Sequence, residues 1–151
     1  MSEAIDESIP DLDEFLCFAI YSTGFAFNRI YRRQLGRLGL TYPQFLVMAA
    51  LWGRDGVAVG SLGVKLSLDT NTLTPLLKRL ELMGLVVRER FKEDERKVIV
   101  NLTAKGSAMR SEADEILRCI FAAADLPAPQ FSKLTRDIQA LRRNLEHAAK
   151  A

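Results

Sequence analysis

Residues 69–103 read DTNTLTPLLKRLELMGLVVRERFKEDERKVIVNLT and join a helical pattern directly to a strand pattern. In the first half, apolar residues recur with the three- and four-residue spacing of one helix face: Leu73, Leu76, Leu77 and Leu80. Gly84 follows, at a place where helices commonly end. In the second half, Val98, Val100 and Leu102 alternate with polar residues, and the polar run 92–95 separates them from the apolar segment 85–88. The stretch therefore predicts an amphipathic helix followed by a β-hairpin.

The exposed face of this helix carries short polar side chains and one lysine: Thr70, Asn71, Thr72, Thr74 and Lys78. A helix fits the major groove of DNA, where short polar side chains reach base edges and lysine reaches phosphate or guanine. A basic hairpin can lie along the neighbouring backbone or in the minor groove. The combination favours a winged helix-turn-helix; the alternative is a solvated surface helix beside a structural hairpin.

The sequence allows two starting points for this helix, because Pro75 lacks a backbone N–H. The helix begins either at Thr72, which places the proline in the first turn, or at Asp69, with a kink at the proline.

Charge is distributed unevenly along the 151 residues. The whole chain carries a net charge of +2, and residues 1–15, with six acids and no base, contribute −6, so residues 16–151 carry +8. A basic folded part suits a polyanion partner such as DNA, although acidic tails are also common as plain solvated extensions. Residues 1–11 are expected to form a disordered acidic tail.

The sequence carries no catalytic or metal-binding motif. Cys17 and Cys119 form no zinc motif or CxxC pair, and the single histidine, His147, leaves no Cys–His or Ser–His pair for nucleophilic catalysis. A glycine-rich phosphate loop is also missing. Without a signal peptide or a membrane-spanning apolar run, we expect a cytoplasmic protein that contacts no membrane, uses no cofactor or metal and is not an enzyme.

Helical patterns flank the winged helix-turn-helix expected at residues 41–103. A first helix is expected at 12–38, ended by Gly39, and a later one at 104–124, capped by Thr103. After a break at 125–129, the last helix carries a two-heptad seam: Phe131, Leu134, Ile138, Leu141 and Leu145. A first helix about 40 Å long is too long for its apolar side chains to be buried within a small monomer. We therefore expect a homodimer, with dimerisation helices at about 12–38 and 104–148; the alternative is a monomeric bundle.

Capping residues locate the helices within the winged helix-turn-helix. Thr41 and Gln44 form a capping box with Pro43 in the first turn, ahead of an apolar helix at 45–52. Ser61 is expected to cap a short helix at 62–66. The expected fold class is mainly α with a β-hairpin wing (α+β), in a single domain at 12–151.

The wing sequence Asp94-Glu95-Arg96 and the following Leu102-Thr103 resemble the MarR family of dimeric winged-helix regulators. The segments 16–22 (LCFAIYS), 40–45 (LTYPQF) and 72–81 (TLTPLLKRLE) are similar to its OhrR branch, whose members are repressors that sense organic hydroperoxides through one cysteine in the first helix. The resemblance covers the chain from Leu16 onward. The chain departs from the branch at Thr70-Asn71, where Ser-Gly is usual, and this bears on operator preference.

Cys17 is the cysteine that this resemblance singles out. Taken by itself, a lone cysteine among apolar residues is most often a small buried hydrophobe, and the nearby acids Asp13 and Glu14 disfavour a thiolate. Tyr21 lies one turn further along the same helix face. Tyr31 lies near that face but about 21 Å away along the axis, so it reaches Cys17 only from an antiparallel partner helix.

In the OhrR branch, two tyrosines of the other subunit hydrogen-bond the reactive sulfur, and they match Tyr31 and Tyr42 here. The resemblance implies that an organic hydroperoxide oxidises Cys17 to a sulfenic acid, which then condenses with a thiol or is oxidised further, and that operator DNA is released. In one version the thiol is a second cysteine from the other subunit, for which Cys119 is the candidate. In the other version it is a small thiol, and Cys119 is a plain buried cysteine.

The resemblance also implies the DNA contacts. The recognition helix presents its polar residues to the major groove of a pseudo-palindromic operator. Arg96 enters the minor groove with Asp94 holding its guanidinium, and Arg88 and Arg90 contact phosphates. Three rival functions are a MarR-type regulator released by a small aromatic ligand, a thiol peroxidase, and a helical protein-interaction module.

Overall fold

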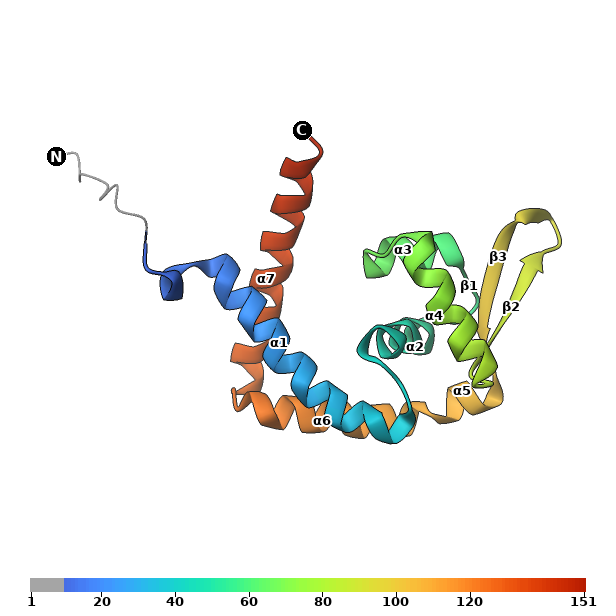
Figure 1. The fold of residues 1–151 in the computed structure, drawn as a ribbon, viewed down its shortest axis with the longest axis horizontal. Coiled ribbons are helices and arrows are strands. Elements are labelled where there is room, and N and C mark those ends of the chain that lie inside the picture. The colour runs from blue at the N-terminus through green and yellow to red at the C-terminus, as the bar shows by residue number, and fades with distance from the viewer. Residues whose placement is uncertain (1–9) are drawn as a thin grey trace. The chain divides into compact units, whose positions relative to one another are not determined.

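A computed structural model describes residues 10–151 as a mainly helical chain with one small antiparallel sheet (Figure 1). The helices are α1 (Leu16–Leu35), α2 (Tyr42–Gly53), α3 (Val59–Leu66), α4 (Thr70–Leu82), α5 (Ala104–Ala108), α6 (Arg110–Ala124) and α7 (Ala128–Ala149), with 3-10 turns η1 (Leu12–Glu14) and η2 (Gly36–Leu38). The strands are β1 (Val57–Ala58), β2 (Val86–Phe91) and β3 (Asp94–Leu102). The expected fold class is therefore confirmed.

The chain divides into two compact units, one up to Ile116 and one from Leu117 onward. The first unit contains both 3-10 turns, α1 to α5, the sheet and the start of α6, and the second contains the rest of α6 and all of α7. The acidic tail expected at 1–11 lies outside the described residues except for Pro10 and Asp11. The single domain at 12–151 and the assignment of the flanking helices to dimerisation stay predictions.

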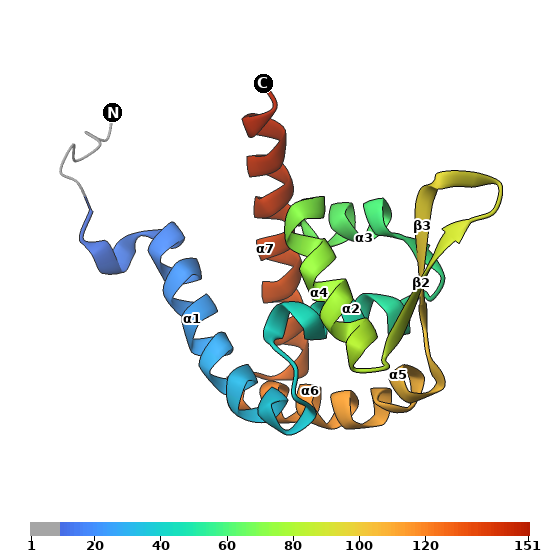
Figure 2. The same cartoon turned by 45° about the vertical axis from the view of Figure 1, so that its right-hand side comes forward.

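Apolar side chains from α1 to α4 and the hairpin form the core of the first unit. Figure 2 shows α2, α3 and α4 grouped beside the strands β2 and β3. The fully buried side chains are Leu35, Val47, Met48, Leu51, Leu62, Leu73, Leu77, Leu80, Leu85, Val86 and Val100. The leucine face predicted for the recognition helix is thus the buried face of α4, although Leu76 is only half-buried. Burial of this face orients α4 with its polar side outward.

Asp69 caps α4, because its Oδ1 accepts a hydrogen bond from the backbone N–H of Thr72 at 2.7 Å. Of the two starts that the sequence leaves open, the one at Asp69 is correct. Pro75 lies inside the helix and removes the N–H that would bond to the carbonyl of Asn71. Just beyond the helix, Gly84 adopts a left-handed conformation (φ 75°), which turns the chain sharply into β2.

The sheet has the strand order β1-β3-β2, and both pairings are antiparallel. The predicted hairpin is confirmed, with a tighter turn than expected, because Phe91 pairs with Asp94 across only two residues. The strand β1 was not predicted. Its two residues pair with Val100 and Ile99, and two residues are too few to produce an alternating pattern.

The helix predicted at 12–38 is wrong as a continuous α-helix. Phe15 is extended (φ −74°, ψ 116°) and separates η1 from α1. Its N–H bonds to the carbonyl of Leu12, which closes a tight turn that hydrophobic spacing does not distinguish from an α-helix. Gly39 does end the segment, with a left-handed φ of 68°.

Two other helix predictions need correction. Ser61 does not cap α3, which begins at Val59 with Ala58 as the capping residue, because β1 leads directly into the helix. The helix predicted at 104–124 is divided at Met109 into α5 and α6. Thr103 caps α5 as predicted, since its Oγ1 accepts from the N–H of Gly106 at 3.0 Å.

Substitution of Gly106 tests whether α5 packs closely against Leu85, the residue just before β2. A Cβ added to Gly106 would lie 2.1 Å from the carbonyl oxygen of Leu85. Gly106→Ala should therefore lower the free energy of unfolding by about 2 kcal/mol or more, as measured by urea denaturation. Gly53→Ala is the matched control, because a Cβ there meets nothing within 4 Å. Equal stability of the two variants would contradict this packing.

Candidate nucleic-acid interface and cysteine site

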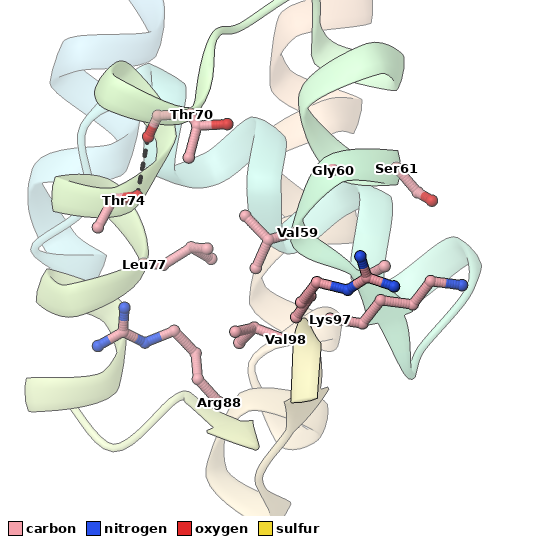
Figure 3. A pocket seen from close by; sticks show the side chains of 11 residues that line it. Val59, Gly60, Ser61, Thr70, Thr74, Leu77, Arg88, Lys97 and Val98 are labelled. Carbon is pink, nitrogen blue, oxygen red and sulfur yellow. Dashed lines mark hydrogen bonds between the residues drawn. The ribbon is translucent and has the colours of Figure 1, made fainter. Parts of the chain in front are cut away.

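A groove of about 690 Å³ runs between α4, the start of α3 and β3 (Figure 3). The hydroxyl residues Thr70, Thr74 and Ser61 line it, together with the cations Arg96 and Lys97. The hydroxyl of Thr74 donates to the carbonyl of Thr70 at 2.8 Å, which fixes its rotamer. A basic groove with hydroxyl groups is suited to the phosphate backbone of a nucleic acid.

The predicted recognition residues all lie on α4, but only some of them line the groove. Thr70 and Thr74 line the groove, whereas Asn71, Thr72 and Lys78 are exposed on the polar side of the helix. Sequence reasoning did not include Ser61 or Lys97 among the binding residues, and both line the groove. Lys97 follows Arg96 in the wing and could have been found by that position. Nothing in the sequence pattern singles out Ser61 for binding.

The tip of the wing has the predicted arrangement of Asp94 and Arg96. The Nε atom of Arg96 lies 3.2 Å from Oδ1 of Asp94, and the backbone N–H of Arg96 donates to the same oxygen. The Arg96 side chain is nevertheless 92% exposed. The carboxylate therefore orients a guanidinium that is free to meet a ligand.

The other two arginines of the predicted set are placed differently. Arg88 lines the groove, but its guanidinium is bound to Glu81, with 3.3 Å between Nε and Oε2. Arg90 lines a separate groove of about 430 Å³, together with Phe91 and Ile99. The structure therefore does not bring Arg90 into the groove beside α4.

Cys17 lies in the first turn of α1, where its thiol is free and exposed in the single chain. Four large apolar residues of α1 are exposed with it: Leu16, Ile20, Tyr21 and Phe25. The rings of Tyr21 and Phe25 meet edge to face, with centroids 4.7 Å apart. This end of α1 therefore presents an apolar face around the thiol.

Tyr31 and Tyr42, which are 11 residues apart in sequence, lie side by side with ring centroids 4.6 Å apart. Burial raises the pKa of Tyr31 to about 12, and the neighbouring Tyr42 adds to the increase. Burial also raises the pKa of Tyr42. Both phenols therefore keep their protons at neutral pH and can donate hydrogen bonds to an anion.

Alkaline unfolding tests the environment of Tyr31. Because its pKa is raised from 10.0 to about 12 on folding, the contribution of this phenol to stability is complete below pH 10 and is lost as pH rises towards 12. The expected loss is about 2–3 kcal/mol. Tyr31→Phe should flatten this pH dependence in urea denaturation, whereas Tyr21→Phe, which alters an exposed ring, should leave it unchanged. The same pH dependence in wild type and Tyr31→Phe would show that another group titrates.

Cys119 lies on α6 and is also free and exposed. In the same unit, Phe121 packs edge to face against Phe131 with centroids 5.1 Å apart, which joins α6 to α7.

Within residues 10–151, no group of three histidine, cysteine or acidic side chains is placed to hold a metal ion. Over the same residues, none of the helices combines the length and apolar character that crossing a bilayer requires.

Known proteins share this fold and part of this sequence. The profile of the family described as transcriptional regulator SarA/Rot matches residues 29–115. The HTH-type transcriptional regulator TtmR of Methylorubrum extorquens is 46% identical over 114 residues, which are 76% of this chain and 58% of TtmR. The chain thus spans little more than half the length of that relative. The organic hydroperoxide resistance transcriptional regulator of Bacillus subtilis is 40% identical over 70% of this chain and 71% of its own length.

Solved structures of DNA-binding regulators are also similar to this chain. Reduced AbfR bound to DNA has a TM-score of 0.75 and 34% identity, covering 87% of this chain and 90% of AbfR, a protein of Staphylococcus epidermidis. The disulfide form of AbfR has a TM-score of 0.65 and 36% identity, covering 83% of this chain and 88% of AbfR. The chain therefore belongs to the MarR/SarA-type family of winged-helix transcriptional regulators, and its similarity to the Bacillus regulator supports the OhrR branch.

Proposed function

We propose that the protein is a homodimeric repressor that releases a pseudo-palindromic operator when an organic hydroperoxide oxidises Cys17. The observation that carries this proposal is the pair of adjacent, protonated phenols of Tyr31 and Tyr42, in a chain whose Cys17 thiol is free and exposed. The identity with the Bacillus regulator and the reduced and disulfide forms of AbfR support thiol chemistry as the input.

The DNA-binding step uses the groove beside α4 and the wing. In a dimer, two recognition helices enter successive major grooves about 34–36 Å apart. Asn71, Thr72 and Lys78 face the bases, while Thr70, Thr74, Ser61 and Lys97 follow the backbone. Arg96, oriented by Asp94, enters the adjacent minor groove, where a guanidinium is favoured by the negative potential.

Arg96→Ala tests the wing. The variant should bind at least about tenfold more weakly than the wild type to a duplex that the wild type selects from a random-sequence pool. A mobility-shift titration measures the affinity, and thermal melting should show an unchanged fold because the side chain is exposed. Lys150→Ala, which removes one positive charge beyond the end of α7, is the control and should bind normally. Equal affinity of Arg96→Ala and wild type would remove the wing from the interface.

The sensing step requires a second subunit. Cys17 and Tyr31 belong to one helix and are about 21 Å apart along its axis, so the phenol of the same chain cannot donate to the sulfur. If the two α1 helices are antiparallel, Tyr31 and Tyr42 of each subunit lie beside the Cys17 thiol of the other subunit. The exposed apolar side chains beside Cys17 are the surface that such a partner would cover.

The chemistry is an oxidation of sulfur by two electrons. The Cys17 thiolate attacks the terminal oxygen of the hydroperoxide, so an S–O bond forms and the O–O bond breaks. The alkoxide leaves and takes up a proton as the alcohol. A thiol then displaces water from the sulfenic acid to give a disulfide, and this thiol belongs to Cys119 of the partner or to a small molecule. A polar group or crosslink at a packed dimer surface displaces the recognition helices, whose separation the operator requires.

Cys17→Ser separates this mechanism from release by a small aromatic ligand. Stoichiometric cumene hydroperoxide should release DNA from the reduced wild type and leave Cys17→Ser bound in a mobility-shift assay. Cys119→Ser is the companion variant: a dimer-sized band on a non-reducing gel that the wild type gives and this variant does not would identify Cys119 as the second thiol, whereas release of DNA without such a band would assign that step to a small thiol. Release of Cys17→Ser by the hydroperoxide would overturn the proposal. Insensitivity of the wild type, combined with release by an aromatic acid, would favour the ligand-responsive alternative.

A further inference from the structure

Glu81 and Arg88 form a closed contact between the recognition helix and the wing. Glu81 lies in the last turn of α4, and Arg88 lies in β2, beyond the turn at Gly84. Three hydrogen bonds join them: Glu81 Oε2 accepts from the backbone N–H of Arg88 at 3.0 Å and from its Nε at 3.3 Å, and Oε1 accepts from Nη2 at 3.3 Å. One carboxylate therefore satisfies both the edge of β2 and the guanidinium.

This contact changes the role expected for Arg88. Its guanidinium is neutralised by Glu81 and its side chain is only 24% exposed, whereas Arg96, in the same groove, is 92% exposed. The hydrogen bonds from Arg88 also lower the pKa of Glu81, so the carboxylate stays ionised at neutral pH. A neutral ion pair adds no net charge to attract phosphate, and a bidentate contact fixes geometry better than a single bond.

We infer that Glu81 and Arg88 are a positioning pair that fixes the direction of the wing relative to the recognition helix, and that Arg88 is not a phosphate ligand. The inference rests on the DNA-binding part of the proposed function. The backbone link supports it, because Leu85 N–H bonds to the Leu80 carbonyl at 3.0 Å and leaves only a short turn between α4 and β2. The ion pair restrains β2 at Arg88, three residues beyond Leu85, where the wing begins to project.

The salt dependence of binding distinguishes positioning from phosphate contact. A side chain that neutralises a phosphate releases a counterion, so its removal lowers the salt slope, meaning the magnitude of the slope of log affinity against log salt, by about one. Loss of a positioning residue weakens binding without changing this slope. The groove supplies a matched control, because Lys97 is an exposed cation that lines it without an ion pair among those found in residues 10–151.

The experiment uses the reduced full-length protein and the duplex that wild type selects from a random-sequence pool. Glu81→Gln and Arg88→Met should each weaken binding about tenfold and keep the wild-type salt slope, whereas Lys97→Met should lower the slope by about one. The exchange of Glu81→Arg with Arg88→Glu should restore affinity towards wild type. Thermal melting checks that each variant is folded, and Glu81→Gln with the exchange carries the test if Arg88→Met does not fold.

Two results would overturn the inference. In the first, Arg88→Met lowers the salt slope as Lys97→Met does and Glu81→Gln binds more tightly, which identifies Arg88 as a phosphate ligand. In the second, Glu81→Gln binds like wild type, which shows that the wing holds its direction without the pair. A wild-type protein that enriches no duplex at all would instead refute the DNA-binding function, and this inference with it. Because the protein is reduced throughout, failure of the hydroperoxide mechanism leaves the result unaffected.

Discussion

The close approach of Gly106 to the carbonyl of Leu85 is the constraint on which the rest of the first unit depends. Around it, Thr103 N–H donates to Leu85 O at 3.0 Å, and Trp52 Nε1 donates to Gly106 O at 2.9 Å. The hydroxyl of Thr103 also donates to Gly84 O. The end of the recognition helix, the base of the hairpin and α2 are therefore joined at one point where no side chain fits. This junction fixes the place from which the wing projects.

The same junction lies at one end of an aromatic series that includes the tyrosines of the proposed sensor. Tyr31 contacts both Tyr42 and Phe45, and Phe45 contacts Trp52, with ring centroids 4.6, 5.7 and 6.1 Å apart. Tyr42, Phe45 and Trp52 all belong to α2. In the proposed mechanism α2 supplies a phenol to the cysteine site, and the same helix holds the base of the wing through Trp52. Packed aromatic rings resist relative displacement, so the proposed sensing site and the proposed DNA-binding surface share one rigid element.

Sequence reasoning predicted the parts of the fold that are set by local patterns. The leucine face of α4 and the caps at Thr41 and Thr103 are confirmed, because each depends on residues within a few positions. The contact between Asp94 and Arg96, which the family resemblance implied, is also present. Features set by tertiary pairing were missed. The strand β1 exists only because Val100 is beside Val57, and Glu81 meets Arg88 only because the turn at Gly84 brings a helix end onto a strand. Spacing in the sequence signals neither of these contacts.

The cysteine site could not be completed from one chain for a geometric reason. A straight helix rises about 1.5 Å per residue, so Tyr31 is permanently remote from Cys17 in α1, however the remaining chain folds. The residues around Cys17 are apolar and exposed in the single chain, which costs free energy unless another surface covers them. In the proposed dimer, an antiparallel copy of α1 solves both problems. In the proposed mechanism, the contact that activates the sulfur is then part of the contact that sets the distance between recognition helices, so oxidation at Cys17 alters operator binding without any separate signalling element.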